Sequence, residues 1–109
     1  MDMFSALADP NRRHIIELLA QNGQLSSTAI SAKFSVSAPA ISQHLKVLRE
    51  AKLVKMEKRA QTHLYQINPE KIEELEVWVQ KLGRMWDARF ERLDRVLAAE
   101  KRKLKTHGR

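Results

Sequence analysis

The sequence predicts a mainly α-helical chain with one small β-hairpin, an α+β class of about five helices and two strands. Apolar residues recur every three or four positions in several segments, which is the helical period. Ser or Asp with a nearby Pro precedes two of these segments, as at a helix start. Two short stretches alternate apolar and polar residues, as strands do. The 109 residues fit one domain, which we expect over residues 1–100, before a basic, flexible tail over residues 101–109.

The N-terminal quarter is expected to form two helices. A short first helix has an apolar side formed by Met3, Phe4 and Leu7. It is too short to be stable alone and must pack on another element. Asp9 and Pro10 start the second helix, as an N-cap acceptor and a proline at the first helical position. Gly23 ends it, because glycine adopts the left-handed conformation without a steric penalty.

Two further helices follow, separated by a tight turn. Ser26 or Ser27 caps a short helix that we expect to run to Phe34. Ser37 caps the next helix, which extends to about Ala51. Its inward side is formed by Ile41, Leu45 and Leu48, spaced four and three apart. Its outward side carries Ser42, Gln43, Lys46 and Arg49.

The remainder predicts a hairpin and one long helix. Residues 53–58 and 62–67 alternate like strands, and residues 59–61 connect them. Pro69 then opens a helix of roughly 30 residues, about 45 Å long. Its apolar positions are Ile72, Leu75, Val79, Leu82, Trp86, Phe90, Leu93 and Leu97. Trp78 and Met85 widen this stripe beyond what one small core needs, so we expect part of it to pack on a second copy of the chain.

Composition excludes several classes of protein. The chain has no cysteine, so disulfides, thiolate metal sites and cysteine nucleophiles are ruled out. We expect no membrane span, signal peptide, enzymatic activity or cofactor, because the corresponding motifs are missing, and we expect a cytoplasmic location. Residues 33–68 carry seven basic and two acidic groups, and residues 101–109 carry five basic groups and no acidic one. Such basic segments favour a polyanion such as double-stranded DNA as the partner.

Helices in this order before a hairpin predict a winged helix-turn-helix, whose helix from Ser37 enters the DNA major groove. Its polar side chains can bond to base edges, and cations at the turn and at the hairpin tip can meet phosphates. The expected DNA contacts are Lys33, Ser35, Ser37, Ala38, Pro39, Ser42, Gln43, His44, Lys46, Lys58, Arg59, Gln61 and Thr62. The expected dimer interface consists of Met3, Phe4, Leu7, Trp78, Leu82, Met85, Trp86, Phe90 and Leu93.

Two strings carry a resemblance to a known family. They are Leu7-Ala-Asp-Pro-Asn-Arg-Arg-His-Ile-Ile-Glu-Leu-Leu19 and Ser37-Ala-Pro-Ala-Ile-Ser-Gln-His-Leu-Lys-Val-Leu-Arg-Glu-Ala-Lys-Leu-Val54. Over about residues 4–97 the chain resembles the ArsR/SmtB family of bacterial repressors. The resemblance implies a homodimer built from the first and last helices, binding to an inverted-repeat operator, and autoregulation. It often also implies release of DNA when an inducer binds, and here the inducer could be a small molecule or a protein.

The departures from the family pattern concern metals and backbone conformation. Metal-sensing members carry cysteines where this chain has Ser27, Thr28 and Ala29, or a ligand set with histidines on the last helix, which has none over residues 69–100. The chain therefore looks like the metal-independent, SdpR-like branch, with no metal site. The family also has Gly where Lys52 stands, so we expect a positive φ there. At the hairpin tip, Ala60-Gln61 replaces the usual Gly-Arg.

Some roles stay open at this level. His44 is expected to contact DNA, with an idle surface histidine as the alternative, whereas His14 and His63 are expected to be structural or solvated. Arg12 and Arg13 could contact phosphate or pair with Glu17 and Asp9. Trp78 and Trp86 fit a dimer core better than a ligand pocket. A winged-helix module that binds only protein, or a DNA-binding activator, would share most of these features.

Overall fold

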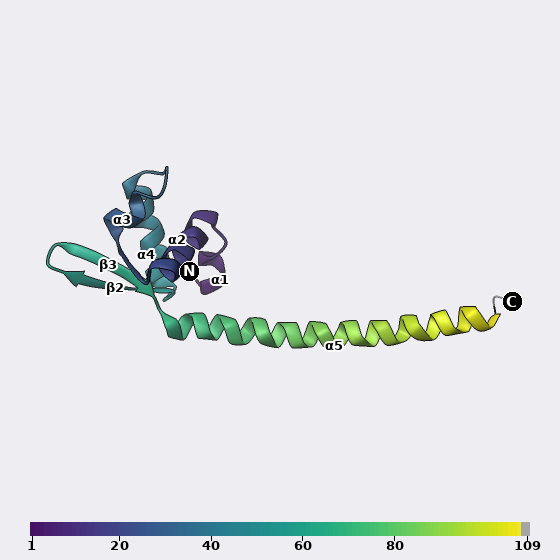
Figure 1. Ribbon diagram of the computed structural model, residues 1–109. Helices are drawn as coiled ribbons and strands as arrows, with labels where there is room; N and C mark the ends of the chain where they lie inside the picture. The colour runs from purple at the N-terminus through teal and green to yellow at the C-terminus, as the bar shows by residue number, and fades with distance from the viewer. Residues whose placement is uncertain (108–109) are drawn as a thin grey trace. The chain divides into compact units, whose positions relative to one another are not determined.

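The computed structural model describes the backbone of residues 1–107 and the side chains of residues 1–102. In chain order the elements are α1 (Met3–Ala6), α2 (Pro10–Asn22), β1 (Gln24–Ser26), α3 (Ser27–Ser31), α4 (Ala38–Glu50), β2 (Val54–Arg59), β3 (Thr62–Ile67) and α5 (Pro69–His107) (Figure 1). The chain divides into two compact units, one over Met1–Glu73 and one that begins at Glu74. The five helices and the β2–β3 hairpin confirm the predicted winged-helix class.

Side-chain caps start four of the helices. Asp2 precedes α1, and its carboxylate accepts a hydrogen bond from the Ser5 N–H. Asp9 precedes α2, and its carboxylate accepts hydrogen bonds from the N–H groups of Asn11 and Arg12. Ser26 and Ser37 cap α3 and α4 in the same way. These bonds satisfy N–H groups that have no partner inside the helix. Of the two serines considered for α3, Ser26 is therefore the cap.

The sheet has three strands, one more than the sequence predicted. β1 pairs with β3, which also pairs with β2, so the order is β1-β3-β2 and both pairings are antiparallel. Tyr65 at the centre of β3 lies opposite Leu25 on one side and Met56 on the other. A strand of three residues shows too little alternation to be recognised in the sequence. The added strand joins the hairpin to the helical part of the first unit.

α3 is shorter than predicted. It ends at Ser31, not at Phe34. After Ser31 the backbone hydrogen bonds span three residues: the N–H groups of Lys33 and Phe34 donate to the carbonyls of Ile30 and Ser31. Such bonds are usual in the last turn of a helix.

The core of the first unit lies between α2, α3, α4 and the sheet. Seven large side chains are almost completely buried there: Ile15, Leu19, Ile30, Ile41, Leu45, Leu48 and Leu53. The three on α4 are those that the four-three spacing placed on its inward side. Their burial holds α4 by one face and leaves the opposite face to solvent.

Among residues 1–107, two residues other than glycine adopt a positive φ. Lys52, directly after the α4 C-cap, has φ 64°, and Ala60 at the hairpin tip has φ 53°. The prediction for Lys52 is confirmed, and its carbonyl accepts a hydrogen bond of 2.8 Å from Asn68 Nδ2. Both conformations cost a residue with a Cβ about 1 kcal/mol relative to glycine. This cost explains why glycine suits both positions better.

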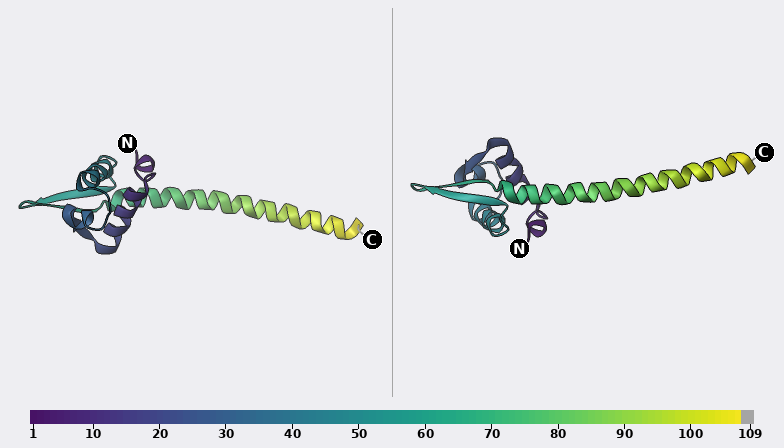
Figure 2. Two further views of the ribbon diagram at one scale, coloured as in Figure 1. Left: turned by 90° about the horizontal axis from the view of Figure 1, so that it is seen from above. Right: turned by 90° about the horizontal axis from the view of Figure 1, so that it is seen from below.

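α5 is longer than predicted. It has 39 residues, roughly 58 Å of helix, and Figure 2 traces it as one continuous helix. The boundary expected at residue 100 is not a helix end, because residues 101–107 continue α5. The sequence of this segment contains neither Gly nor Pro, and Lys and Arg have favourable helix propensity. Residues 108 and 109 of the expected tail lie outside the described residues. Within the described range, no helix is both long and apolar enough to cross a membrane.

Candidate nucleic-acid interface

The outward face of α4 is polar and accessible. Ser37 Oγ accepts a hydrogen bond of 3.3 Å from the Ala40 N–H, and Pro39 stands in the first turn, where its missing N–H costs nothing. Ser42, Gln43 and Lys46 are exposed, as predicted from the spacing. A rigid helix that presents short polar side chains over two turns is suited to reading base edges in a major groove.

The turn between α3 and α4 adds further exposed groups. Lys33, Ser35, Ala38 and Pro39 are exposed and flank the start of α4. A hollow of about 370 Å³ lies between the two helices, lined by Ser27, Thr28, Ser31, Ala32, Ala38, Ile41 and Ser42. It carries four hydroxyl groups and no charge. The hollow therefore offers hydrogen bonding, but no strong electrostatic attraction for an ion.

The hairpin presents cations at its tip. In the β2–β3 register, Lys58 lies opposite His63 and Arg59 lies opposite Thr62, and all four are exposed. Arg59 Nε is 3.1 Å from Glu57 Oε1, and both side chains are more than half exposed. Such an exposed pair contributes little stability. Glu57 nevertheless offsets part of the positive charge that the hairpin would offer to a phosphate.

His44 lies differently from the other predicted DNA contacts. It is half-buried, and its Nδ1 is 3.4 Å from Nη1 of Arg12 on α2. Arg12 also donates to the backbone carbonyls of Ala6 and Ser5. The expected pairing of Arg12 with Asp9 is present as electrostatic attraction, and the expected phosphate contact stays a prediction. The side-chain bonds of Arg12 have other partners. The sequence carried no signal for them, because they join segments up to 32 residues apart.

Arg13 resembles Arg12 in part. Its Nη1 donates to the carbonyls of Leu7 and Ala8 at 2.7 and 3.1 Å. The two guanidinium groups thus add donors to four carbonyls at the end of α1 and just after it, although the Ser5 carbonyl also accepts from the Ala8 N–H at 3.2 Å. A helix of four residues depends on such outside partners.

Asp9 lies in the same region. Its burial acts to raise its pKa, but the backbone N–H donors of Arg12 and Asn11, together with attraction to the Arg12 guanidinium, hold the pKa below its usual value of 3.8. The Asp2 pKa is lowered as well, chiefly by its hydrogen bonds from Ser5. Both N-cap carboxylates are therefore favoured in the charged form that accepts hydrogen bonds and complements the helix N-terminus.

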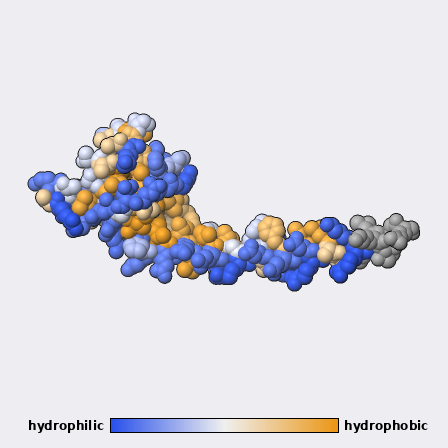
Figure 3. All heavy atoms as spheres, viewed as in Figure 1, coloured by the Kyte–Doolittle hydropathy of each residue, from blue (hydrophilic) through white to orange (hydrophobic). Residues whose placement is uncertain are grey.

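The residues predicted for a dimer interface fall into two groups. Met3 is only 7% exposed, because it packs into the core of its own unit, so it has little surface left for a partner. Leu7 is half-buried, whereas Phe4 is 48% exposed. On α5 all six predicted residues are exposed: Trp78, Leu82, Met85, Trp86, Phe90 and Leu93. Apolar surface shows along α5 beside hydrophilic surface in Figure 3.

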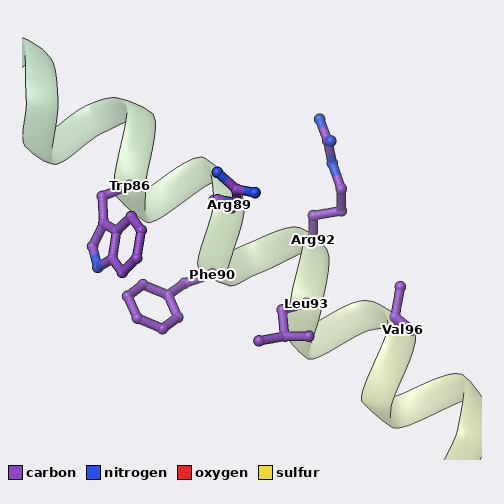
Figure 4. Close-up of a pocket in the computed structure, with 6 residues that line it drawn as sticks. All are labelled: Trp86, Arg89, Phe90, Arg92, Leu93 and Val96. Carbon is purple, nitrogen blue, oxygen red and sulfur yellow. The ribbon is translucent and has the colours of Figure 1, made fainter.

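A hollow of about 360 Å³ lies on this helix, lined by Trp86, Arg89, Phe90, Arg92, Leu93 and Val96. The rings of Trp86 and Phe90 meet edge to face, with centroids 4.9 Å apart and an interplanar angle of 85°. Figure 4 shows Trp86, Phe90 and Leu93 along one side of the helix. All the lining residues belong to α5, so the hollow is part of the apolar face and not an enclosed pocket.

The histidines are dispersed. His14 stacks at a tilt on Phe34, with ring centroids 4.9 Å apart, and His63 is exposed on β3. In the part of the chain that the structure describes, no three His, Asp or Glu side chains gather in a way that could hold a metal ion.

The known proteins that resemble this chain in sequence and in structure are transcriptional regulators. The sequence profile of bacterial regulatory proteins of the arsR family matches residues 9–56. The transcriptional repressor SdpR of Bacillus subtilis is 31% identical over 72% of this chain and 86% of its own length. An arsenical resistance operon repressor of Staphylococcus xylosus is 35% identical over 62% of this chain and 64% of its own. The structure of an ArsR-like transcriptional regulator from Rhodococcus sp. RHA1 superposes with a TM-score of 0.70 at 25% identity, over 85% of this chain and 87% of that one.

Proposed function

Because this chain belongs to the arsR family of bacterial regulatory proteins, we propose that it represses transcription as a homodimer on an inverted-repeat operator. Its own promoter is included among the targets, and no metal signal is needed. The observation that carries the proposal is the arrangement of α4, held in the core by Ile41, Leu45 and Leu48 with an exposed polar face opposite them.

Ser42 and Gln43 on that face are the residues assigned to base reading. Gln has both a donor and an acceptor and can form a bidentate pair with adenine, and Ser can bond to any base. Ala38, in the first turn, can contact a thymine methyl group. Because α4 is anchored by large buried side chains, these groups are held in position before DNA binds, which lowers the entropy cost of binding.

Cations beside the reading helix are assigned to phosphates. Lys33 precedes α4, Lys46 lies on its exposed face, and Lys58 and Arg59 stand at the tip of the hairpin. Ser35, Ser37, Pro39, Gln61 and Thr62 complete the proposed contact surface. Phosphate contacts set the position of the protein, whereas base contacts set the sequence it prefers.

A homodimer is supported by the apolar face of α5. Its exposed large residues are Trp78, Val79, Leu82, Met85, Trp86, Phe90, Leu93, Val96 and Leu97, each 47–61% exposed. So large an apolar face on one helix is typical of an interaction surface. Phe4 of α1 offers a further exposed aromatic group. Two copies would place two α4 helices about 34 Å apart, one turn of B-DNA, on a symmetric site.

Independence from metals is supported by the residues themselves. The chain has no cysteine, and Ser27, Thr28 and Ala29 occupy the positions where thiol-dependent sensors of the family bind metal. The helix over residues 69–100 has no histidine, which removes the commonest nitrogen ligand of zinc. A hydroxyl group is a poor substitute for a thiolate in binding zinc or trivalent arsenic.

Selection from random duplex DNA tests the proposal. The full chain is incubated with a random library at about 150 mM salt, and bound DNA is sequenced over several rounds. An enriched inverted repeat supports a dimeric operator reader. Weak binding to all sequences, with a steep dependence on salt, would contradict sequence-specific repression and favour a protein-interaction role.

A variant pair then tests the reading helix. Gln43→Ala should weaken binding to the selected operator by about tenfold, equivalent to one good base contact. Gln21→Ala, at an exposed position of α2, is the matched control and should bind normally. Equal affinity for both variants and the unmodified chain would contradict the assignment of Gln43.

A further inference from the structure

Arg12 joins the short N-terminal helix to the reading helix. Its Nε donates to the Ala6 carbonyl at 2.6 Å, and its Nη2 donates to the Ser5 carbonyl at 3.3 Å. Its remaining amino group, Nη1, lies 3.4 Å from Nδ1 of His44 on α4. A planar guanidinium fork can serve three acceptors at once, which a lysine ammonium could not do with this geometry.

The chemistry of this contact determines the form of the His44 ring. A guanidinium group has only donors, so a hydrogen bond with His44 requires Nδ1 to be the acceptor. In a neutral imidazole one nitrogen accepts and the other carries the hydrogen. The hydrogen of His44 must then be on Nε2. A histidine without such a neighbour distributes its hydrogen between the two nitrogens.

We propose that Arg12 is a positioning residue for DNA recognition, because it holds the His44 ring as the Nε2–H tautomer and so makes His44 a hydrogen-bond donor. The expected effect of Arg12 on DNA binding rests on the proposed function, whereas the tautomer of His44 does not depend on it. A donor at Nε2 is suited to acceptor groups on DNA, which are phosphate oxygens, N7 and O6 of guanine, N7 of adenine and O4 of thymine. It is not suited to the amino groups of cytosine or adenine.

Arg13 provides the matched control for this inference. Like Arg12, it donates to carbonyls at or beyond the end of α1, those of Leu7 and Ala8. The bond to His44 is formed by Arg12. Effects shared by Arg12→Met and Arg13→Met report the loss of carbonyl partners, and effects confined to Arg12→Met report the link to α4. Methionine keeps most of the apolar stem in both variants.

Nitrogen NMR of the full chain without DNA tests the tautomer directly. With ¹⁵N-labelled histidine at about pH 8.5, where histidine side chains are neutral, the long-range imidazole spectrum distinguishes Nδ1 from Nε2 protonation. The signal missing in His44→Ala identifies His44, and exposed His63 serves as the internal reference. We expect a single Nε2–H tautomer for His44 in the unmodified chain and in Arg13→Met. In Arg12→Met, the His44 ring should instead show the mixture of Nδ1–H and Nε2–H tautomers that His63 shows. A mixture in the unmodified chain would overturn the inference.

A binding cycle tests the consequence for DNA. With the selected operator at fixed salt, Arg12→Met should weaken binding by at least about fivefold, the size of one hydrogen bond, and Arg13→Met should not. In the His44→Ala background, Arg12→Met should have no further effect, because Arg12 acts through the ring. Additive losses would overturn the positioning role. If the unmodified chain selects no operator, the proposed function fails while the NMR result still decides the tautomer.

The same variants separate the two kinds of acceptor on DNA. If His44 donates to a phosphate, His44→Ala weakens binding to all sequences alike and reduces the salt dependence. If it donates to a base, the loss is confined to the operator and the preference at one base pair relaxes. An unchanged affinity for both kinds of DNA would overturn the assignment of His44 as a donor to DNA.

Discussion

Val77 and Val79 allow the proposed dimer face of α5 to be tested with one residue type. Both are half exposed, at 57% and 51%, and they lie two positions apart on the same helix. Two positions correspond to about 200° of rotation. Val79 therefore belongs to the apolar stripe with Leu82 and Trp86, whereas Val77 lies on the opposite side. Replacing either by alanine removes the same atoms and has the same effect on helix propensity.

The expected effect follows from the surface that a partner would cover. Val→Ala removes the equivalent of two CH₂ groups, each contributing about 0.8 kcal/mol when fully buried. Because about half of Val79 is still exposed in the protomer, a partner would add about 0.8 kcal/mol per copy. Two copies contribute about 1.6 kcal/mol to the dimer, so Val79→Ala should raise the dimer Kd about tenfold. Val77→Ala should leave the Kd within about twofold.

Sedimentation equilibrium over a range of concentrations measures the dimer Kd for both variants and the unmodified chain. Circular dichroism at the same concentrations shows whether α5 keeps its helix content. Equal effects of the two substitutions, in either direction, would refute the stripe as the interface. A chain that stays monomeric at all concentrations would refute the homodimer itself.

Three further predictions concern backbone strain, capping and metals. Lys52→Gly should raise the free energy of unfolding by up to about 1 kcal/mol, because glycine adopts the positive φ without strain, although it also makes the unfolded chain more flexible. Urea denaturation measures this free energy, and a loss of stability would contradict the strain at Lys52. Asp9→Ala should lower the free energy of unfolding by about 1 kcal/mol at pH 7 through loss of the α2 cap, and an unchanged value would argue against that cap. Because the folded-state pKa of Asp9 lies below 3.8, the stabilisation by its charge is present above that pH and is lost as the pH falls through the lowered pKa. Asp9→Asn, which does not titrate, should therefore approach the unmodified chain in stability below about pH 4, and a constant difference from pH 7 to pH 3 would contradict the lowered pKa. Zn²⁺, arsenite or a chelator should leave operator affinity unchanged in a gel-shift assay, and a stoichiometric effect of any of them would contradict the metal-independent proposal.

Local features of the sequence predicted much of the fold. Ser37, Pro39 and the spacing of the buried residues placed α4 within one residue at each end, because caps and helical period act over a few neighbouring positions. The positive φ of Lys52 was predictable from the family pattern of glycine at that position. Gly23 ends α2 as expected, with φ 80°. In each case the physical cause lies within one or two turns of chain.

Other features were missed because they depend on distant partners. β1 exists because β3 offers it an edge, and three residues alone carry no readable period. Met3 was expected at a dimer interface but is buried in its own unit, since an apolar side chain does not specify which apolar surface it meets. The continuation of α5 past residue 100 was also missed. The run of basic charge there predicts a flexible tail, although the helix propensity of Lys and Arg is favourable.

The sequence by itself therefore determined the order of the elements, the face of α4 that is buried and the polar residue types on its exposed face. These properties follow from short-range periodicity, capping and charge. Only the tertiary structure decided what Arg12 does. Its three acceptors are contributed by residues 5, 6 and 44, and a hydrogen bond exists only where packing brings donor and acceptor within about 3.5 Å. The sequence showed that His44 and Arg12 were available, and the packing of α2 against α4 joined them.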